Sequence, residues 1–225
     1  MAIEAGAPPG AARHALLLAW SPLAVVAIGH LTARLAGQAI GAAAWVPLTI
    51  VFWLTLALLI RAGGGFAAWR RWVQAARAGS SRGWPALAIV VALLPAPLLW
   101  MNWRLLAPWS LWLPWLLFAL INPWFEEGYW RGVLLEATRG WPPLAALLYS
   151  SACFALSHPL IWGVNSVANR TPEVVVSTFL MGLAWGTIFR RTGSLRWCIL
   201  SHVLVDLFNL SVVVFLNLYI PPHRP

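Results

Sequence analysis

An apolar stretch of the sequence contains two adjacent carboxylates, Glu126 and Glu127, followed by Arg131. A charge near the centre of a bilayer costs at least ~2.5 kcal/mol, so three ionisable groups in such a stretch need a specific purpose. Residues four apart lie on the same face of a helix, and an acid that precedes its base is the better order for an ion pair. The spacing predicts that Glu127 pairs with Arg131, while Glu126 points about 140° away from Arg131 and keeps a free carboxylate.

Two further groups of residues with possible chemistry interrupt apolar segments at the same spacing. His158 follows Phe154 by four residues, and Asp206 follows His202 by four residues, so each pair lies on one helical face. Asn209 extends the second stripe. A carboxylate in an apolar pocket can take a proton from water and pass it to a leaving amine, and imidazoles can stabilise a developing oxyanion. Structural ion pairs, or a proton relay, would use the same residue types.

The rise of a helix decides whether these groups can meet. Measured from a turn near Gly140, Glu126 lies about 21 Å back along its helix and His158 about 27 Å forward. Two helices joined at that turn would bring both side chains to a similar depth. From Gly193, His202 lies only about 14 Å along its helix, so helix tilt or a displaced turn must close the difference.

The segments that carry these residues are typical of a helical membrane protein. Of the 225 residues, 61% are hydrophobic and 9% are charged. This composition predicts an all-α, polytopic transmembrane helical bundle with about seven spans, or eight, in a single integral membrane domain over residues 1–225. The expected spans are residues 15–35, 43–61, 84–102, 108–137, 142–158, 173–190 and 196–218.

Two segments depart from a simple crossing. The span at 108–137 is longer than one crossing requires and contains Pro114 and Pro123, which predicts a tilted or kinked helix, or a span with a broken extension. Residues 66–82 combine arginines with tryptophans and other apolar residues, which is typical of an amphipathic helix lying in the membrane interface. Arg13 precedes the first apolar stretch without a clean cleavage site after it, so we expect a retained first helix and not a signal peptide.

Arginine supplies the positive charge, because the chain contains no lysine and has a net charge of +9. In a soluble protein such a charge would suggest a nucleic-acid partner. Here the arginines lie between apolar segments, so the positive-inside rule explains them and no nucleic-acid partner is expected. With seven spans, eleven arginines fall on the side of the N-terminus and four on the other, which predicts N-terminus inside and C-terminus outside.

The order EExxxR, FxxxH and HxxxD resembles the three motifs of the CPBP family, also called the Abi or CAAX-protease family of intramembrane proteases. The stretch from Gly182 to Gly186, continued by residues 190–195, is similar to the family's joint before the last motif. Each motif is weak alone, whereas the three together are specific. The resemblance covers residues 110–210, which it marks as the catalytic core.

This resemblance implies an endopeptidase that hydrolyses a peptide bond of a membrane-associated protein or peptide inside a helical cavity. It makes Glu126 the base that activates water, assisted by His158. His202 and Asp206 would polarise the scissile carbonyl and support its oxyanion. This compact chain resembles the prokaryotic members of the family, which implies a location in the cytoplasmic, or inner, membrane of a prokaryote. The lipid bilayer is then a partner of the protein. The resemblance does not predict an oligomeric state.

The remaining motif residues have supporting roles in this interpretation. The pair formed by Glu127 and Arg131 would hold the geometry, and Phe154 and Asn209 would flank the catalytic groups.

A metal and two other functions stay as alternatives. The family is often labelled metalloprotease, and His158, His202 and Glu126 could hold zinc with an open water position. The usual HExxH helix is absent, so no cofactor is predicted. A non-catalytic membrane scaffold or immunity-type protein of the same fold would not need all these residues. A proton-coupled transporter would be favoured by two repeated halves with broken helices, which the sequence does not display.

Overall fold

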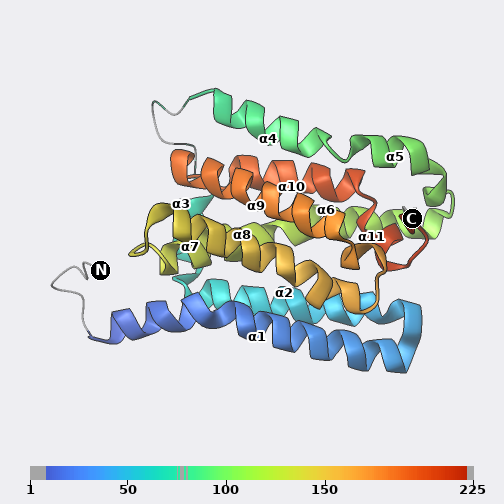
Figure 1. Ribbon diagram of the computed structural model, residues 1–225, viewed down its shortest axis with the longest axis horizontal. Helices are drawn as coiled ribbons and strands as arrows, with labels where there is room; N and C mark the ends of the chain where they lie inside the picture. The colour runs from blue at the N-terminus through green and yellow to red at the C-terminus, as the bar shows by residue number, and fades with distance from the viewer. Residues whose placement is uncertain (1–8, 75, 77–78, 80, 222–225) are drawn as a thin grey trace.

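The computed structural model describes residues 9–74, 76, 79 and 81–221, and the secondary structure of this part of the chain is helical throughout (Figure 1). Most of the long helices run side by side along the longest axis of the molecule (Figure 1). The α-helices are α1 (Pro9–Ile40), α2 (Trp45–Ala62), α3 (Gly65–Trp72), α4 (Gly83–Leu93), α5 (Ala96–Asn102), α6 (Trp112–Glu127), α7 (Leu134–Ala137), α8 (Pro143–Leu160), α9 (Pro172–Thr192), α10 (Arg196–Phe208) and α11 (Ser211–Phe215).

Within the residues that the structure describes, four helical stretches are long and apolar enough to cross a membrane. They are Gly10–Ala62, Gly83–Leu106, Pro143–Val164 and Pro172–Thr192. The first contains both α1 and α2, which fold back on each other as a hairpin (Figure 1). The all-α class is therefore confirmed, and each of the seven expected spans is largely helical, while the number of crossings stays a prediction.

Within the fourth expected span the helix changes type. Between α6 and α7, residues Gly128–Val133 form a π-helical turn, so the chain remains helical from Trp112 to Ala137. A π-turn inserts one extra residue per turn and is often found at functional sites. The last expected span, 196–218, is divided in two, because Leu210 adopts a left-handed conformation (φ 58°) between α10 and α11.

The helix expected over residues 66–82 is wrong in its length, since α3 ends at Trp72. Residues 75, 77, 78 and 80 of that range lie outside the described residues. The carbonyl groups of Trp72, Val73 and Gln74 accept hydrogen bonds from the turn between α9 and α10. These tertiary contacts take the place of further turns of helix. Within α3 the expected amphipathic pattern is present, because Trp72 is buried while Arg71 is exposed.

Two glycines let α3 pack directly against the π-turn. A Cβ atom at Gly128 would lie 2.3 Å from the Trp69 ring, and one at Gly132 would lie 2.6 Å from the Trp72 ring. No larger residue fits at either position without moving a tryptophan. The close approach fixes α3 against the helical segment that contains Glu127.

The polarity of the bundle is that expected of a protein surrounded by lipid. Large apolar side chains such as Leu17 and Leu58 are exposed on the outer faces of the helices, whereas Glu127 and Arg131 are fully buried. Polar groups inside a bundle and apolar groups outside it are typical of membrane proteins, in which ionisable residues face the interior.

Candidate active site

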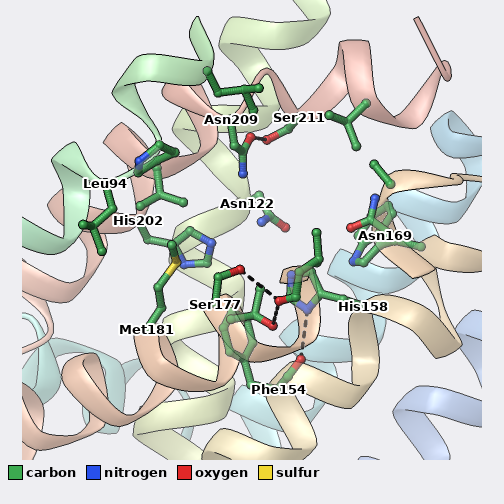
Figure 2. Close-up of a pocket in the computed structure, with 18 of the residues that line it drawn as sticks. Leu94, Asn122, Phe154, His158, Asn169, Ser177, Met181, His202, Asn209 and Ser211 are labelled. Atoms are coloured by element: carbon green, nitrogen blue, oxygen red, sulfur yellow. Dashed lines mark hydrogen bonds between the residues drawn. The ribbon is translucent and has the colours of Figure 1, made fainter. Parts of the chain in front are cut away.

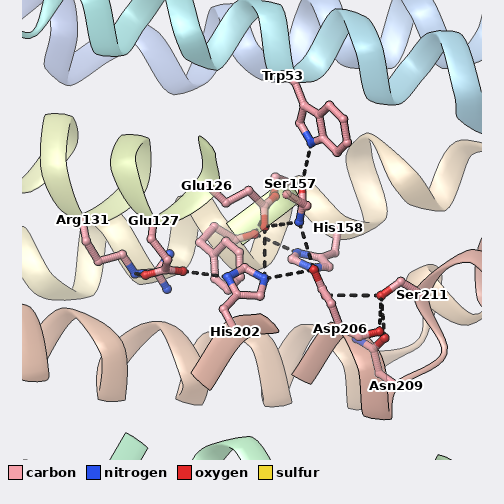
Figure 3. A network of polar contacts seen from close by, with 12 residues as sticks. Trp53, Glu126, Glu127, Arg131, Ser157, His158, His202, Asp206, Asn209 and Ser211 are labelled. Carbon is pink, nitrogen blue, oxygen red and sulfur yellow. Dashed lines mark hydrogen bonds and ion pairs between the residues drawn. The ribbon is translucent and has the colours of Figure 1, made fainter. Parts of the chain in front are cut away.

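The three motif groups predicted from the sequence meet in the interior of the bundle (Figure 3). The end of α6 carries Glu126 and Glu127, while α10 carries His202 and Asp206. All four side chains are buried. The mismatch in depth between α6 and α10 is closed, because both glutamates reach His202. The turn before α10 is bound to the end of α3, with the Leu195 amide 2.7 Å from the Trp72 carbonyl.

Glu127 forms the predicted ion pair with Arg131. Arg131 Nε lies 3.3 Å from Glu127 Oε2, and both side chains are almost completely buried. The guanidinium carbon lies 4.4 Å from the centre of the Phe154 ring and 5.3 Å from that of Trp185. The faces of these rings stabilise the cation where water is scarce. Phe154 therefore packs against the arginine, and the Phe154 and His158 rings are nearly perpendicular, with their centres 5.0 Å apart.

His202 is held by carboxylates on both of its ring nitrogens. Its Nδ1 lies 2.8 Å from Glu127 Oε1, and its Nε2 lies 3.4 Å from Glu126 Oε2 and 3.8 Å from Asp206 Oδ2. The indole of Trp185 stacks on the imidazole at 4.5 Å with an interplanar angle of 18°. The ring is thus fixed in plane and orientation, and a protonated His202 can donate from both nitrogens.

Glu126 is held through one oxygen only. Its Oε2 accepts a hydrogen bond from Asn122 Nδ2 at 3.2 Å and faces His202. Its Oε1 has no hydrogen-bond partner in the part of the chain that the structure describes. This matches the prediction that Glu126 keeps a carboxylate oxygen free of Arg131, and it leaves that oxygen able to accept a hydrogen bond from a small molecule.

A cavity of about 420 Å³ opens beside these groups (Figure 2). Its wall consists mainly of apolar side chains from helices that include α4, α6, α8, α9 and α10, and Glu126, His158 and His202 lie among them. A mostly apolar cavity with a few convergent polar groups is typical of a ligand or active site. The volume lies within the range of small-ligand sites.

A hydrogen bond to the backbone determines the tautomer of neutral His158. Its Nδ1 lies 3.0 Å from the carbonyl oxygen of Phe154, which can only accept a hydrogen bond. In the neutral ring Nδ1 therefore carries the hydrogen, and Nε2 is an acceptor. His158 lines the same cavity as Glu126, and among the described residues no hydrogen bond joins the two side chains.

Asp206 and Asn209 lie at the end of the site that is close to α11. Asp206 Oδ2 accepts from Asn122 Nδ2 at 3.3 Å, and its Oδ1 accepts from Ser211 Oγ at 3.3 Å. The same hydroxyl lies 2.6 Å from Asn209 Oδ1. The Ser211 hydroxyl thus links Asn209 to Asp206, and Asn209 also lines the cavity.

Several polar partners in this site were not predicted from the sequence. Asn122 precedes Glu126 by four residues in an apolar stretch, so the spacing alone could have placed it on the same helical face. Trp185 and Ser211 gave no comparable signal, because tryptophan is frequent along the chain and serine is common in loops. Trp53, which donates to Asn122, comes from α2, a helix outside the motifs.

The side chains do not fit a zinc ion in this arrangement. Across residues 9–74, 76, 79 and 81–221, no group of three or more His, Cys, Asp or Glu side chains is positioned to hold a metal ion. His202 directs Nδ1 to Glu127 and Nε2 to two carboxylates, and the His158 Nδ1 is bonded to the backbone. A site made of His158, His202 and Glu126 would require these side chains to move.

A comparison with models of protein families gives a match that spans this site. Residues 107–208 match the family model described as Type II CAAX prenyl endopeptidase Rce1-like. The match includes both glutamates, the arginine, both histidines and the aspartate of the site. No curated protein and no solved structure matches the chain.

Proposed function

Because residues 107–208 belong to the Rce1-like family of type II CAAX prenyl endopeptidases, the chain is a protease, and we propose that it cleaves a peptide bond inside the membrane. The substrate is a membrane-associated protein or peptide whose scissile bond enters the cavity of α6, α8, α9 and α10. The observation that carries this proposal is that Glu126 lines a cavity together with two histidines, while its Oε1 has no hydrogen-bond partner among the described residues. Family membership favours this function over a scaffold or a proton-coupled transporter.

Glu126 is the general base in the mechanism that we propose. Its Oε1 accepts a proton from a water molecule while the water oxygen bonds to the scissile carbonyl carbon. The carbonyl π electrons move to the oxygen, which becomes an oxyanion. The C–N bond of this tetrahedral intermediate then breaks, and Glu126 returns the proton to the departing amine. Glu126 is again an ionised carboxylate at the end of the cycle. The reaction consumes only the peptide bond and one water molecule.

The histidines have different roles because their hydrogen-bond partners differ. His158, with Nε2 as an acceptor, can orient the attacking water beside Glu126. His202, bound by carboxylates at both nitrogens, is suited to donate to the oxyanion from Nε2. Asp206 supports this donor, and the pair of Glu127 and Arg131 keeps the His202 ring in place.

The family and the four apolar stretches make the chain an integral membrane protein. For its topology we propose seven crossings with the N-terminus inside and the C-terminus outside, in the cytoplasmic membrane of a prokaryote. The arginine distribution supports this orientation. Reporter fusions at the two termini test it, since the proposal requires opposite sides.

The proposed function is tested by a search for substrates in cells. Membrane proteomes from cells that express the wild-type chain or Glu126→Gln are compared by mass spectrometry of newly formed peptide ends. We expect at least one membrane peptide to be cleaved only with the wild type. Identical sets of peptide ends in the two samples would contradict a proteolytic function.

Asp206 offers a separate prediction, because two substitutions distinguish between its possible roles. Asp206→Asn keeps an oxygen that accepts from Asn122 and Ser211 and adds an amide donor, so we expect activity within roughly tenfold of wild type. Asp206→Leu removes both roles and should lower kcat about 10²-fold or more. Leucine is favourable in lipid, so the helix should persist. Steady-state kinetics of cleavage of the identified peptide measure both variants. Full activity of Asp206→Leu would show that catalysis does not need Asp206.

The metal alternative has its own measurement. Because the side chains present do not fit zinc, we expect purified active protein to contain far less than one zinc per chain and to keep its activity with a membrane-permeant chelator. Elemental analysis and activity are measured on the same sample. A stoichiometric metal that is lost and restored together with activity would overturn the glutamate mechanism.

A further inference from the structure

Asn122 links the carboxylates of two different helices. It is 3% exposed and lies one turn before Glu126 on α6. Its Nδ2 is 3.2 Å from Glu126 Oε2 and 3.3 Å from Asp206 Oδ2. An amide nitrogen carries two hydrogens, so the group can donate one to each carboxylate.

Trp53 determines which way this amide points. Its indole Nε1 lies 3.0 Å from Asn122 Oδ1. An indole N–H can only donate, so the amide oxygen must face Trp53 and the NH₂ group must face the carboxylates. The opposite orientation would set donor against donor and acceptor against acceptor. The Trp53 ring stacks on Phe118 at 6.0 Å and on Phe125 at 5.7 Å, which holds the donor in place.

The two carboxylates need this shared donor because they face the same imidazole nitrogen. Glu126 Oε2 and Asp206 Oδ2 lie 3.4 Å and 3.8 Å from His202 Nε2, which carries at most one hydrogen. Like charges this close repel strongly where water is scarce. The amide of Asn122 gives each carboxylate a donor of its own. It also binds Glu126 through Oε2, and Oε1 has no hydrogen-bond partner among the described residues.

We propose that Asn122 is a positioning residue of the proteolytic site and that Trp53 sets the orientation of its amide. The inference rests on the proposed function, since Asn122 acts through Glu126 and Asp206. Trp53 does not line the cavity, so its effect on the reaction can only be transmitted through the amide and the packing around it.

The first test removes the donor without changing the shape of the side chain. Asn122→Asp replaces the NH₂ group with a third acceptor, so Glu126 should turn away from its working position. We expect kcat on the peptide identified in the proteome comparison to fall roughly 10²-fold, the cost of a misplacement of about 1 Å. KM should change little, because the apolar wall of the cavity is intact. Asn102→Asp, at an asparagine outside the site, is the matched control and should stay near wild type.

A second pair of variants tests the orientation of the amide. Trp53→Phe keeps an aromatic ring against Phe118 and Phe125 but removes the N–H group, so the amide is free to reverse. We expect kcat to fall roughly tenfold with an unchanged unfolding temperature. Trp124→Phe, on α6, is the matched control, since the Trp124 indole contacts Trp69 and not the site.

Exchange of the two groups separates positioning from general structural damage. In the double variant Asn122→Asp with Asp206→Asn, the amide lies at position 206 and can donate to the carboxylates at 122 and 126. We expect its kcat to recover to within roughly tenfold of Asp206→Asn alone. Equal losses from Asn122→Asp in the two backgrounds would overturn the inference, as would wild-type kcat for Asn122→Asp and Trp53→Phe.

The same assay distinguishes this inference from the proposed function. If Glu126→Gln is inactive while the Asn122 and Trp53 variants behave as wild type, only the positioning role is wrong. If Glu126→Gln cleaves normally, or if no peptide end depends on Glu126, the proposed function and the inference both fail.

Discussion

Replacing Glu126 with glutamine should lower kcat for peptide cleavage by about 10²–10⁴-fold, the range that a positioned general base supplies. Glutamine has nearly the same shape, and its oxygen can still accept from Asn122. It cannot accept a proton from water and return it to an amine. The reaction therefore loses its proton carrier while the cavity and the fold persist. Steady-state kinetics of the purified protein in lipid or detergent measure the effect.

The matched control for this variant is Glu136→Gln. Glu136 pairs with Arg139 at the surface and is absent from the lining of the cavity. Its substitution removes the same charge and should leave kcat unchanged. Equal activity of Glu126→Gln and Glu136→Gln would show that Glu126 is not the base.

Replacing Glu127 with glutamine should instead destabilise the protein. Arg131 is 1% exposed, and among the described residues its ion-pair partner is Glu127. Removing one partner of a buried pair costs about 3–5 kcal/mol, because the other charge stays buried without compensation. The rings of Phe154 and Trp185 can offset only part of this cost. We expect a clear fall in unfolding temperature and in the yield of folded protein.

A second substitution shows whether the stranded charge is the cause. Arg131→Met in the Glu127→Gln background removes the charge and keeps a long apolar side chain against Phe154 and Trp185. The double variant should regain much of the lost stability, because uncharged side chains of similar volume often replace a buried ion pair without loss. Thermal unfolding of the three proteins provides the comparison. A Glu127→Gln protein as stable as wild type would contradict the structural role of the pair.

Local spacing was sufficient to predict much of the site. The pairing of Glu127 with Arg131 follows from one helical turn, and the same argument separates Glu126 from the arginine. Helical rise alone could not predict that Glu126 and His202 meet, because it placed the two side chains at different depths in the bundle. The resemblance to a protease family supplied the reason to expect contact, and the structure confirms it.

Features that depend on packing between distant segments could not be predicted. Asn122 and Asp206 are separated by 84 positions, so their contact exists only because α6 lies against α10. The early end of α3 is set by hydrogen bonds to the turn before α10, which no local pattern encodes. The stacking of Trp185 on His202 likewise needs α9 and α10 side by side. In each case tertiary contacts decide between conformations that the local sequence permits.

The most direct test of hydrolysis by a Glu126-activated water is the fate of the water oxygen. The purified wild-type protein and Glu126→Gln are each incubated with the identified peptide in water enriched in heavy oxygen, and the fragments are analysed by mass spectrometry. We expect the wild type to yield two fragments with solvent oxygen in the new carboxyl group, and Glu126→Gln to yield almost none. Intact peptide with the wild type, or labelled fragments at the same rate from Glu126→Gln, would contradict this mechanism.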